Sequence, residues 1–204
     1  VVRHLGMGKP RPQAVRDGAG EVALPILVST LTFLVVFLPV IFLTGMAGFL
    51  FTPLAAAVAF ATVIGGALGL AAGFYRGWFD RVSMMFTDAL LAFPGILLAL
   101  GLIAVIGPSR NGIVLALGIA YLPKVLRIAR SAALSLRRRE FVEASRALGN
   151  GSFYTLARHV LPNALTPIAV FATSMFGWVI LVESALSFLG LGVPPPAPTW
   201  GNML

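Results

Sequence analysis

Residues 22–75 read VALPILVSTLTFLVVFLPVIFLTGMAGFLFTPLAAAVAFATVIGGALGLAAGFY and contain no charged side chain. A helix needs about 20 apolar residues to cross the hydrocarbon core of a bilayer, so this run is long enough for two crossings. Glycine and proline between residues 45 and 53 mark a turn between them. The stretch therefore predicts a transmembrane helical hairpin.

The composition agrees with a membrane protein. Hydrophobic residues make up 58% of the 204 residues and charged residues 11%, and the mean hydropathy is +0.95. Such a chain has too little polar surface for a soluble domain. The net charge of +8 could indicate nucleic-acid binding, but the basic residues flank apolar runs and form no stripe on one soluble face, so we expect no nucleic-acid partner. The absence of cysteine excludes disulfides and thiolate metal sites.

Three further apolar runs follow the hairpin. They cover residues 89–109, a run that begins near Asn111, and roughly 163–189. The fourth span runs into Lys124, Arg127 and Arg130, whose long stems can snorkel toward water. With the N-terminus inside, all of the 15 Lys and Arg residues except Arg110 are cytoplasmic. The sequence thus predicts an all-α membrane protein with about five transmembrane helices and a cytoplasmic N-terminus.

A regularly spaced motif lies in the basic loop between the fourth and fifth spans. A Glu-Ala-Ser triplet is followed after three residues by Gly, and after nine more by His, one residue and Leu-Pro. This pattern is typical of a short amphipathic helix, a glycine turn, a second short helix and a proline that opens the next span. The residues concerned are Glu143, Ala144, Ser145, Gly149, His159, Leu161 and Pro162.

The spacing resembles the EAA loop of ATP-binding-cassette (ABC) importer permeases, with Ser145 at the third Ala and His159 at an often-Ile position. That resemblance implies that the loop is the contact with a cytosolic ATPase. Residues from about 62 to 204 are similar, more narrowly, to the C-type subunit of the dipeptide, oligopeptide and nickel branch. The segments that carry this likeness are Gly69–Tyr75, Asp88–Gly95, Arg139–Ala144, Arg158–Asn163, Ala185–Pro195 and Trp200–Leu204.

The resemblance implies a pore-forming permease subunit of the bacterial inner membrane, and not an enzyme. Its implied partners are a second homologous permease subunit, cytosolic ATPases and an extracytoplasmic substrate-binding protein. No phosphate-binding loop motif is present, so we expect no cofactor in this chain and expect ATP to bind the partner subunits. Peptide and nickel both remain open as substrates.

The first sixty residues resemble a different family, the proton-driven resistance-nodulation-division (RND) efflux pumps. The likeness is carried by Val2–Pro10, Ala14–Gly18, Glu21–Thr30, Val35–Val40 and Leu50–Ala55. We therefore divide the chain into an efflux-like fragment, 1–60, and an importer permease domain, 61–204, which we expect to be truncated at both ends. The segment lacks an intramembrane pair of carboxylates for proton relay. An RND efflux fragment or a non-functional chimera is the alternative function, and a fusion or a misassembled gene would explain the junction equally.

A ladder of small residues crosses this junction at four-residue intervals, namely Ala57, Ala61, Gly65, Gly69 and Gly73. Such a ladder lets a neighbouring helix approach closely, although similar ladders are frequent in apolar spans.

Four further features have two interpretations each. Glu183, near the outer end of the fifth span, belongs either to the translocation path or to the exposed interface. Pro94 should kink the third span, as a gate or as a packing bend. Asp88 can cap a helix or pair with Arg81. The arginines at 137–139 can anchor the chain to anionic membrane lipid or contact an ATPase.

Overall fold

The computed structural model describes residues 42–194 and 196–203, together with residues 6–8, 10, 13, 17 and 40. Most of the predicted first span lies outside the described residues. Within the described part, every regular element is helical. The elements are α3 (Gly45–Tyr75), α4 (Gly77–Leu91), α5 (Gly95–Ile106), α6 (Arg110–Leu136), α7 (Glu140–Ala147), α8 (Ser152–Thr155), the π-helix η1 (Leu156–Val160), α9 (Leu161–Phe188) and the 3₁₀-helix η2 (Gly201–Met203).

Three helical stretches in the described residues are long and apolar enough to cross a membrane, and a bent pair makes a fourth if it is one span. The three are α3, α6 and the continuous stretch Ser152–Phe188. The expected all-α membrane class is confirmed at this level. The turn expected between residues 45 and 53 is wrong, because α3 runs through Pro53 without a break. Prolines are tolerated in membrane helices where neighbouring groups satisfy the freed carbonyl.

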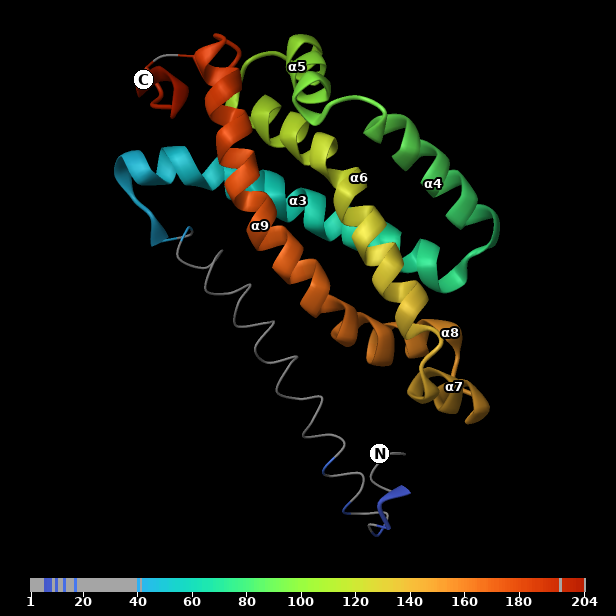
Figure 1. The fold of residues 1–204 in the computed structure, drawn as a ribbon. Helices are drawn as coiled ribbons and strands as arrows, with labels where there is room; N and C mark the ends of the chain where they lie inside the picture. The colour runs from blue at the N-terminus through green and yellow to red at the C-terminus, as the bar shows by residue number, and fades with distance from the viewer. Residues whose placement is uncertain are drawn as a thin grey trace.

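The third span, expected as one helix over 89–109, is instead two helices bent by 91° at a short break (Figure 1). The break falls at Phe93-Pro94-Gly95, where proline removes an N–H and disfavours the helical conformation of the residue before it. At 1.5 Å per residue, the 12-residue α5 rises only about 18 Å and cannot cross alone. Residues 77–88, which lie between the second and third apolar runs, belong to α4.

The helices α3 and α6 pack through the ladder of small residues. A Cβ atom added at Gly65 would lie 2.8 Å from the carbonyl oxygen of Leu122, and one at Gly73 would lie 2.5 Å from that of Arg130. Only glycine permits backbones to come this close. The close approach predicted from the ladder is therefore confirmed. It continues before the sequence junction, because a Cβ atom added at Gly118 of α6 would lie 3.4 Å from the carbonyl oxygen of Ala57.

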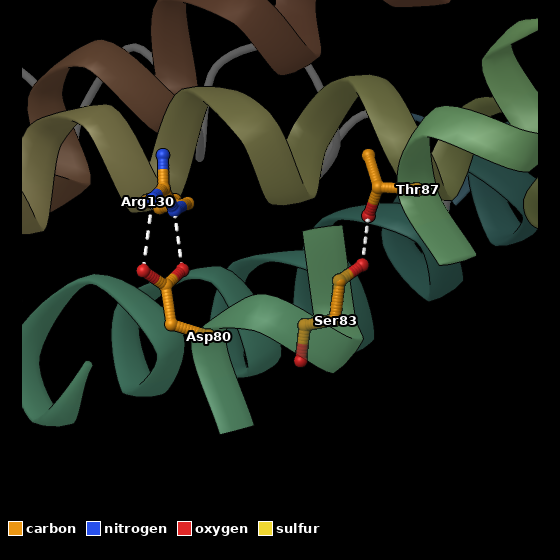
Figure 2. A network of polar contacts seen from close by, with 4 residues as sticks. All are labelled: Asp80, Ser83, Thr87 and Arg130. Atoms are coloured by element: carbon orange, nitrogen blue, oxygen red, sulfur yellow. Dashed lines mark hydrogen bonds and ion pairs between the residues drawn. The ribbon is translucent and has the colours of Figure 1, made fainter. Parts of the chain in front are cut away.

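Two ion pairs hold α4 against α6. Arg130 donates from Nε and Nη2 to the two carboxylate oxygens of the buried Asp80, at 2.5 and 2.8 Å, and Figure 2 shows the two side chains facing each other across the helices. The Thr87 hydroxyl donates within α4 to the Ser83 carbonyl at 2.7 Å. Asp88, which lies two turns after Asp80 on α4, pairs with Arg127 at 2.5 Å on the exposed surface. Its partner is thus on α6, not Arg81.

The segment after α9 folds back onto the end of that helix. Ser187 and Thr199 share a buried hydrogen bond between their hydroxyls. The Trp200 ring packs edge-on against Phe51 of α3, with ring centroids 5.5 Å apart. This end of the molecule lies far from α7 and α8 (Figure 1).

Candidate functional site

The predicted motif forms a compact projection where α6 ends and α9 begins (Figure 1). We call residues 140–155, which comprise α7, a turn and α8, the helical knob. Its first helix starts after an extended residue, Arg139, whose carbonyl accepts hydrogen bonds from the backbone N–H groups of Val142 and Glu143, at 2.9 and 3.2 Å. Acidic Glu140 and Glu143 occupy the first turn, where they complement the positive end of the helix dipole.

The turn that closes α7 depends on Gly149. Its N–H donates to the carbonyl of Arg146 at 2.9 Å, and the N–H of Asn150 donates to that of Ser145 at 3.2 Å. Gly149 has a φ of 81°, in the left-handed region that side chains with a Cβ adopt at a cost. No atom lies within 4 Å of the position a Cβ would take, so a larger residue here would strain the backbone without crowding its neighbours.

A buried polar contact fixes the two halves of the knob. The hydroxyls of Ser145 and Thr155 lie 3.0 Å apart, and the Asn150 amide donates to the Ser145 hydroxyl at 3.2 Å. Val142 and Val160 are completely buried beside them. The serine at the usual alanine position therefore bridges the two short helices. Sequence reasoning missed Thr155 and Asn150, although a serine on the inner face of an amphipathic helix signals a nearby hydroxyl or amide.

The opposite face of the knob is exposed and mixes acidic with apolar character. Glu143 and Ala144 are exposed on α7. Leu148, Phe153 and Tyr154 are exposed by 81%, 76% and 51%. A group of large apolar side chains in water is typical of a protein-protein contact when it is contiguous and rimmed by polar residues.

The chain leaves the knob through the π-helix η1. The carbonyl of His159 accepts a hydrogen bond from the Asn163 amide at 2.7 Å, and the His159 ring packs edge-on against Tyr154 at 5.9 Å between centroids. Leu161 is partly exposed, and Pro162 stands in the first turn of α9, where its missing N–H is not needed. No cluster of three metal-ligating side chains occurs among the described residues.

A cation–π contact joins the knob to the end of α3. The guanidinium carbon of Arg146 lies 5.2 Å from the centre of the buried Phe74 ring. The contact therefore ties α7 to the end of a membrane-spanning helix. Nothing in the linear sequence marks this contact, because the two residues are separated by three helices.

The remaining predicted residues lie elsewhere. Glu183 is on α9, 22 residues after Leu161, and is 5% exposed, with no hydrogen-bond partner for Oε2 among the described residues. The interpretation of interfacial exposure is therefore wrong for this chain, since the carboxylate points into the bundle. Pro94 stands at the bend between α4 and α5. Neither residue is part of the knob.

The bundle and its projecting knob define a multi-pass membrane protein of the transporter class, and comparison with known sequences identifies the family. Residues 65–204 match the binding-protein-dependent transport system inner membrane component family. The chain belongs to this family and is a multi-pass inner-membrane protein. The family is a transport family and not a class of enzymes. Residues 1–71 are similar to the AcrB/AcrD/AcrF family of efflux pumps.

Several curated proteins are similar to the chain over 70–73% of its length. A dipeptide transport system permease protein of Alkalihalophilus pseudofirmus is 45% identical over 148 residues, which cover 72% of this chain and 49% of that protein. Glutathione transport system permease proteins of Pectobacterium atrosepticum and Escherichia coli are 42% and 44% identical, covering 70% and 73% of this chain and 47% and 50% of theirs. The chain thus spans about half the length of the curated relatives it matches.

Proposed function

We propose that residues 61–204 act as a permease domain of an ABC importer, forming part of the translocation path for peptides or, in the alternative, nickel. The family match and the names of the relatives, which are peptide, dipeptide and glutathione permeases, support this proposal. The names favour a peptidic substrate over nickel.

The observation that carries the proposal is the geometry of the helical knob. Its inner face is fixed by the Ser145–Thr155 contact, and its outer face presents Glu143, Leu148 and Phe153 to a partner. A rigid projection with an apolar, acid-rimmed surface suits the groove of a cytosolic ATPase. Closure of the ATPases would pull the loop from Glu143 to Pro162 and, through Pro162 and the Arg146–Phe74 contact, tilt α9 and α3 from an inward-open to an outward-open state.

The proposed assembly requires further partners. In it, the end of the bundle that bears the knob faces the cytoplasm, as the distribution of basic residues predicts for a chain of about five spans with its N-terminus inside. A second permease subunit would pack on the apolar side chains that α9 leaves exposed, which include Val170, Trp178 and Leu181. An extracytoplasmic binding protein would deliver the substrate to the opposite end.

Glu183 and Pro94 are proposed to belong to the translocation path. A buried carboxylate without a partner is costly in a membrane protein and persists where it has a role. The unpaired Oε2 of Glu183 supports that role. The bend at Pro94 supplies a point at which α5 can swing relative to α4.

The knob is tested by changing Gly149. At a φ of 81° a β-branched residue is strained by roughly 1 kcal/mol or more, which would redirect α8 while leaving the spans intact. In an otherwise complete permease, Gly149→Val should insert and accumulate normally but lose transport and the copurifying ATPase. Glu143→Ala should weaken ATPase association less, because it removes one polar contact and keeps the backbone path.

Gly151→Val is the matched control. Gly151 lies in the same turn, but its φ of −60° is open to any residue and nothing lies within 4 Å of its Cβ position. It should therefore keep ATPase association. Normal transport by Gly149→Val, or unchanged ATPase binding in both Gly149→Val and Glu143→Ala, would show that the knob is not the docking element.

The efflux-like match favours a separate origin for residues 1–60, and we propose a boundary near residues 60–62. The two family matches overlap over 65–71, a few residues after this boundary, and both positions lie inside α3, so the proposed junction would fall within one unbroken helix. With this boundary, residues 1–60 would be only a fragment of an efflux pump. The alternative to the importer proposal is a non-functional chimera. We expect sequencing of the source DNA across codons 60–62 to show two separate genes. Continuous independent reads, with a matching peptide from cells, would establish a true fusion.

A further inference from the structure

Four arginines gather where α3 and α6 end beside the knob. Arg76 follows α3, Arg137 and Arg138 follow α6, and Arg146 lies on α7. We call these four residues the arginine cluster. The two ion pairs of α4 with α6 use Arg127 and Arg130, and no member of the cluster pairs with a carboxylate among the described residues.

Arg137 is the centre of the cluster. Its Nη1 atom is completely buried and has no hydrogen-bond partner in the described chain. Burial lowers the pKa of Arg137 below its usual value, and the charges of Arg146, Arg76 and Arg138 lower it further. The charge of Arg76 acts on the carboxylate of Asp80, but both oxygens of that carboxylate accept hydrogen bonds from Arg130. The side chain of Arg137 is only partly buried, so its remaining N–H groups are open to a ligand, and an anion there would offset the like charges around it.

The surroundings indicate that this anion comes from a membrane and not from water. Tyr75 and Trp78, on either side of Arg76, are exposed by 48% and 74%, and tyrosine and tryptophan concentrate at the headgroup level of bilayers. The cluster also stands at the ends of two membrane-spanning helices. Its guanidinium groups are therefore placed at the depth of lipid phosphates.

An apolar groove begins two residues after Arg76. It has a volume of about 320 Å³ and lies between α3, α4 and α6. Side chains that line it include Leu68, Trp78, Phe79, Val82, Phe86 and Leu126. Its lining is that of a site for a hydrocarbon chain. The hydroxyls of Ser83 and Thr87 and the indole N–H of Trp78 are the polar groups of its side chains, and Thr87 already bonds within α4.

We propose that the arginine cluster and this groove together hold one anionic phospholipid. Its phosphate contacts Arg137, and one acyl chain lies along α4. The site rests on the proposed function only in that it places this end of the bundle at the cytoplasmic leaflet, where anionic lipids concentrate. A lipid held there would contact both α4 and the end of α6, from which the helical knob projects.

Native mass spectrometry of the purified full chain tests the proposal with dioleoyl-phosphatidylglycerol and dioleoyl-phosphatidylcholine as probes. We expect one phosphatidylglycerol to be retained on the order of tenfold more tightly than phosphatidylcholine, because both carry a phosphate but the choline cation of phosphatidylcholine cancels its charge and is repelled by the arginine cluster. Arg137→Gln should remove most of this preference. Arg138→Gln, at an exposed position that should not affect folding, should reduce it. Arg110→Gln, at the far end of α6, is the matched control and should not.

Two further experiments distinguish the phosphate of a lipid from free inorganic phosphate. Val82→Trp fills the groove without changing charge and should also release the lipid, whereas inorganic phosphate should not displace it. Equal retention of the two lipids, equal losses in Arg137→Gln and Arg110→Gln, or displacement by inorganic phosphate would overturn the proposal.

ATPase copurification, measured in parallel, distinguishes this site from the proposed function. If Arg137→Gln keeps the lipid but loses the ATPase, the cluster binds an acidic protein surface and the lipid proposal is wrong. If no ATPase copurifies with the unchanged protein while phosphatidylglycerol is still selected, the lipid site stands and the importer proposal fails.

Discussion

An alanine at Gly69 should push α3 and α6 apart. The added Cβ would press on the carbonyl oxygen of Leu126 and lie 2.8 Å from the Ala129 Cβ and 3.0 Å from the Arg130 nitrogen. Carbon atoms prefer a separation of about 3.5–4.0 Å, so the helices must separate by roughly 1 Å. Because two of the three atoms belong to the backbone, no side-chain rotation relieves the clash. Overpacking of this kind costs about 1–3 kcal/mol.

The matched control is Gly66→Ala, one turn away on the same helix, where nothing lies within 4 Å of the added Cβ. Both substitutions gain up to about 1 kcal/mol of helix propensity, so their difference isolates the collision. At about 2–4 °C per kcal/mol for a chain of this size, Gly69→Ala should melt roughly 2–12 °C below Gly66→Ala. Thermal unfolding in detergent, followed by circular dichroism, measures this. Equal melting temperatures would refute the close approach of the two helices.

Two further predictions concern topology and the attachment of α4. In this cysteine-free chain, Ala47→Cys and Ala197→Cys should react with an impermeant thiol reagent added outside, while Asn150→Cys should not; outside labelling at 150 would place the knob on the wrong side of the membrane. Asp80→Asn should cost up to about 3–5 kcal/mol, because it removes the charge partner of the guanidinium in a partly buried ion pair, whereas Asp88→Asn, in an exposed pair, should cost about 0–1 kcal/mol. The same thermal unfolding measurement compares them, and equal losses would contradict the burial of the first pair.

The long helices could be predicted because uncharged runs and small-residue ladders are local signals. The expected start near Asn111 and the observed start of α6 at Arg110 differ by one residue, and the span expected from about residue 163 begins at Leu161. The expected break between 45 and 53 was wrong, because Pro53 is a reliable helix breaker in water but not within a bundle that satisfies the freed carbonyl.

The knob could be predicted in outline and not in its internal contacts. The spacing from Glu143 to Gly149 is enough to indicate a helix that ends in a left-handed turn. The partners that hold its shape lie further away: Thr155 is ten residues from Ser145, and Phe74 is joined to Arg146 only by the tertiary fold. Contacts of this kind depend on how the helices pack, which a local pattern does not record.

The charges on α6 also attach α4. Lys124 and Arg127 are exposed, which agrees with stems that snorkel toward water. In addition, Arg127 and Arg130 pair with carboxylates of α4, and the Lys124 ammonium lies 4.8 Å from the centre of the Tyr121 ring.

Positions 80 and 88 are two turns apart on α4, and 127 and 130 are neighbours on one face of α6, so both pairs form only when α4 is helical and antiparallel to α6. Asp80 and Asp88 therefore attach α4 to the bundle. These arginines serve packing as well as orientation. The predicted topology does not depend on these arginines. When they are left out of the count of basic residues on each side of the membrane, the others, apart from Arg110, still fall on the predicted cytoplasmic side.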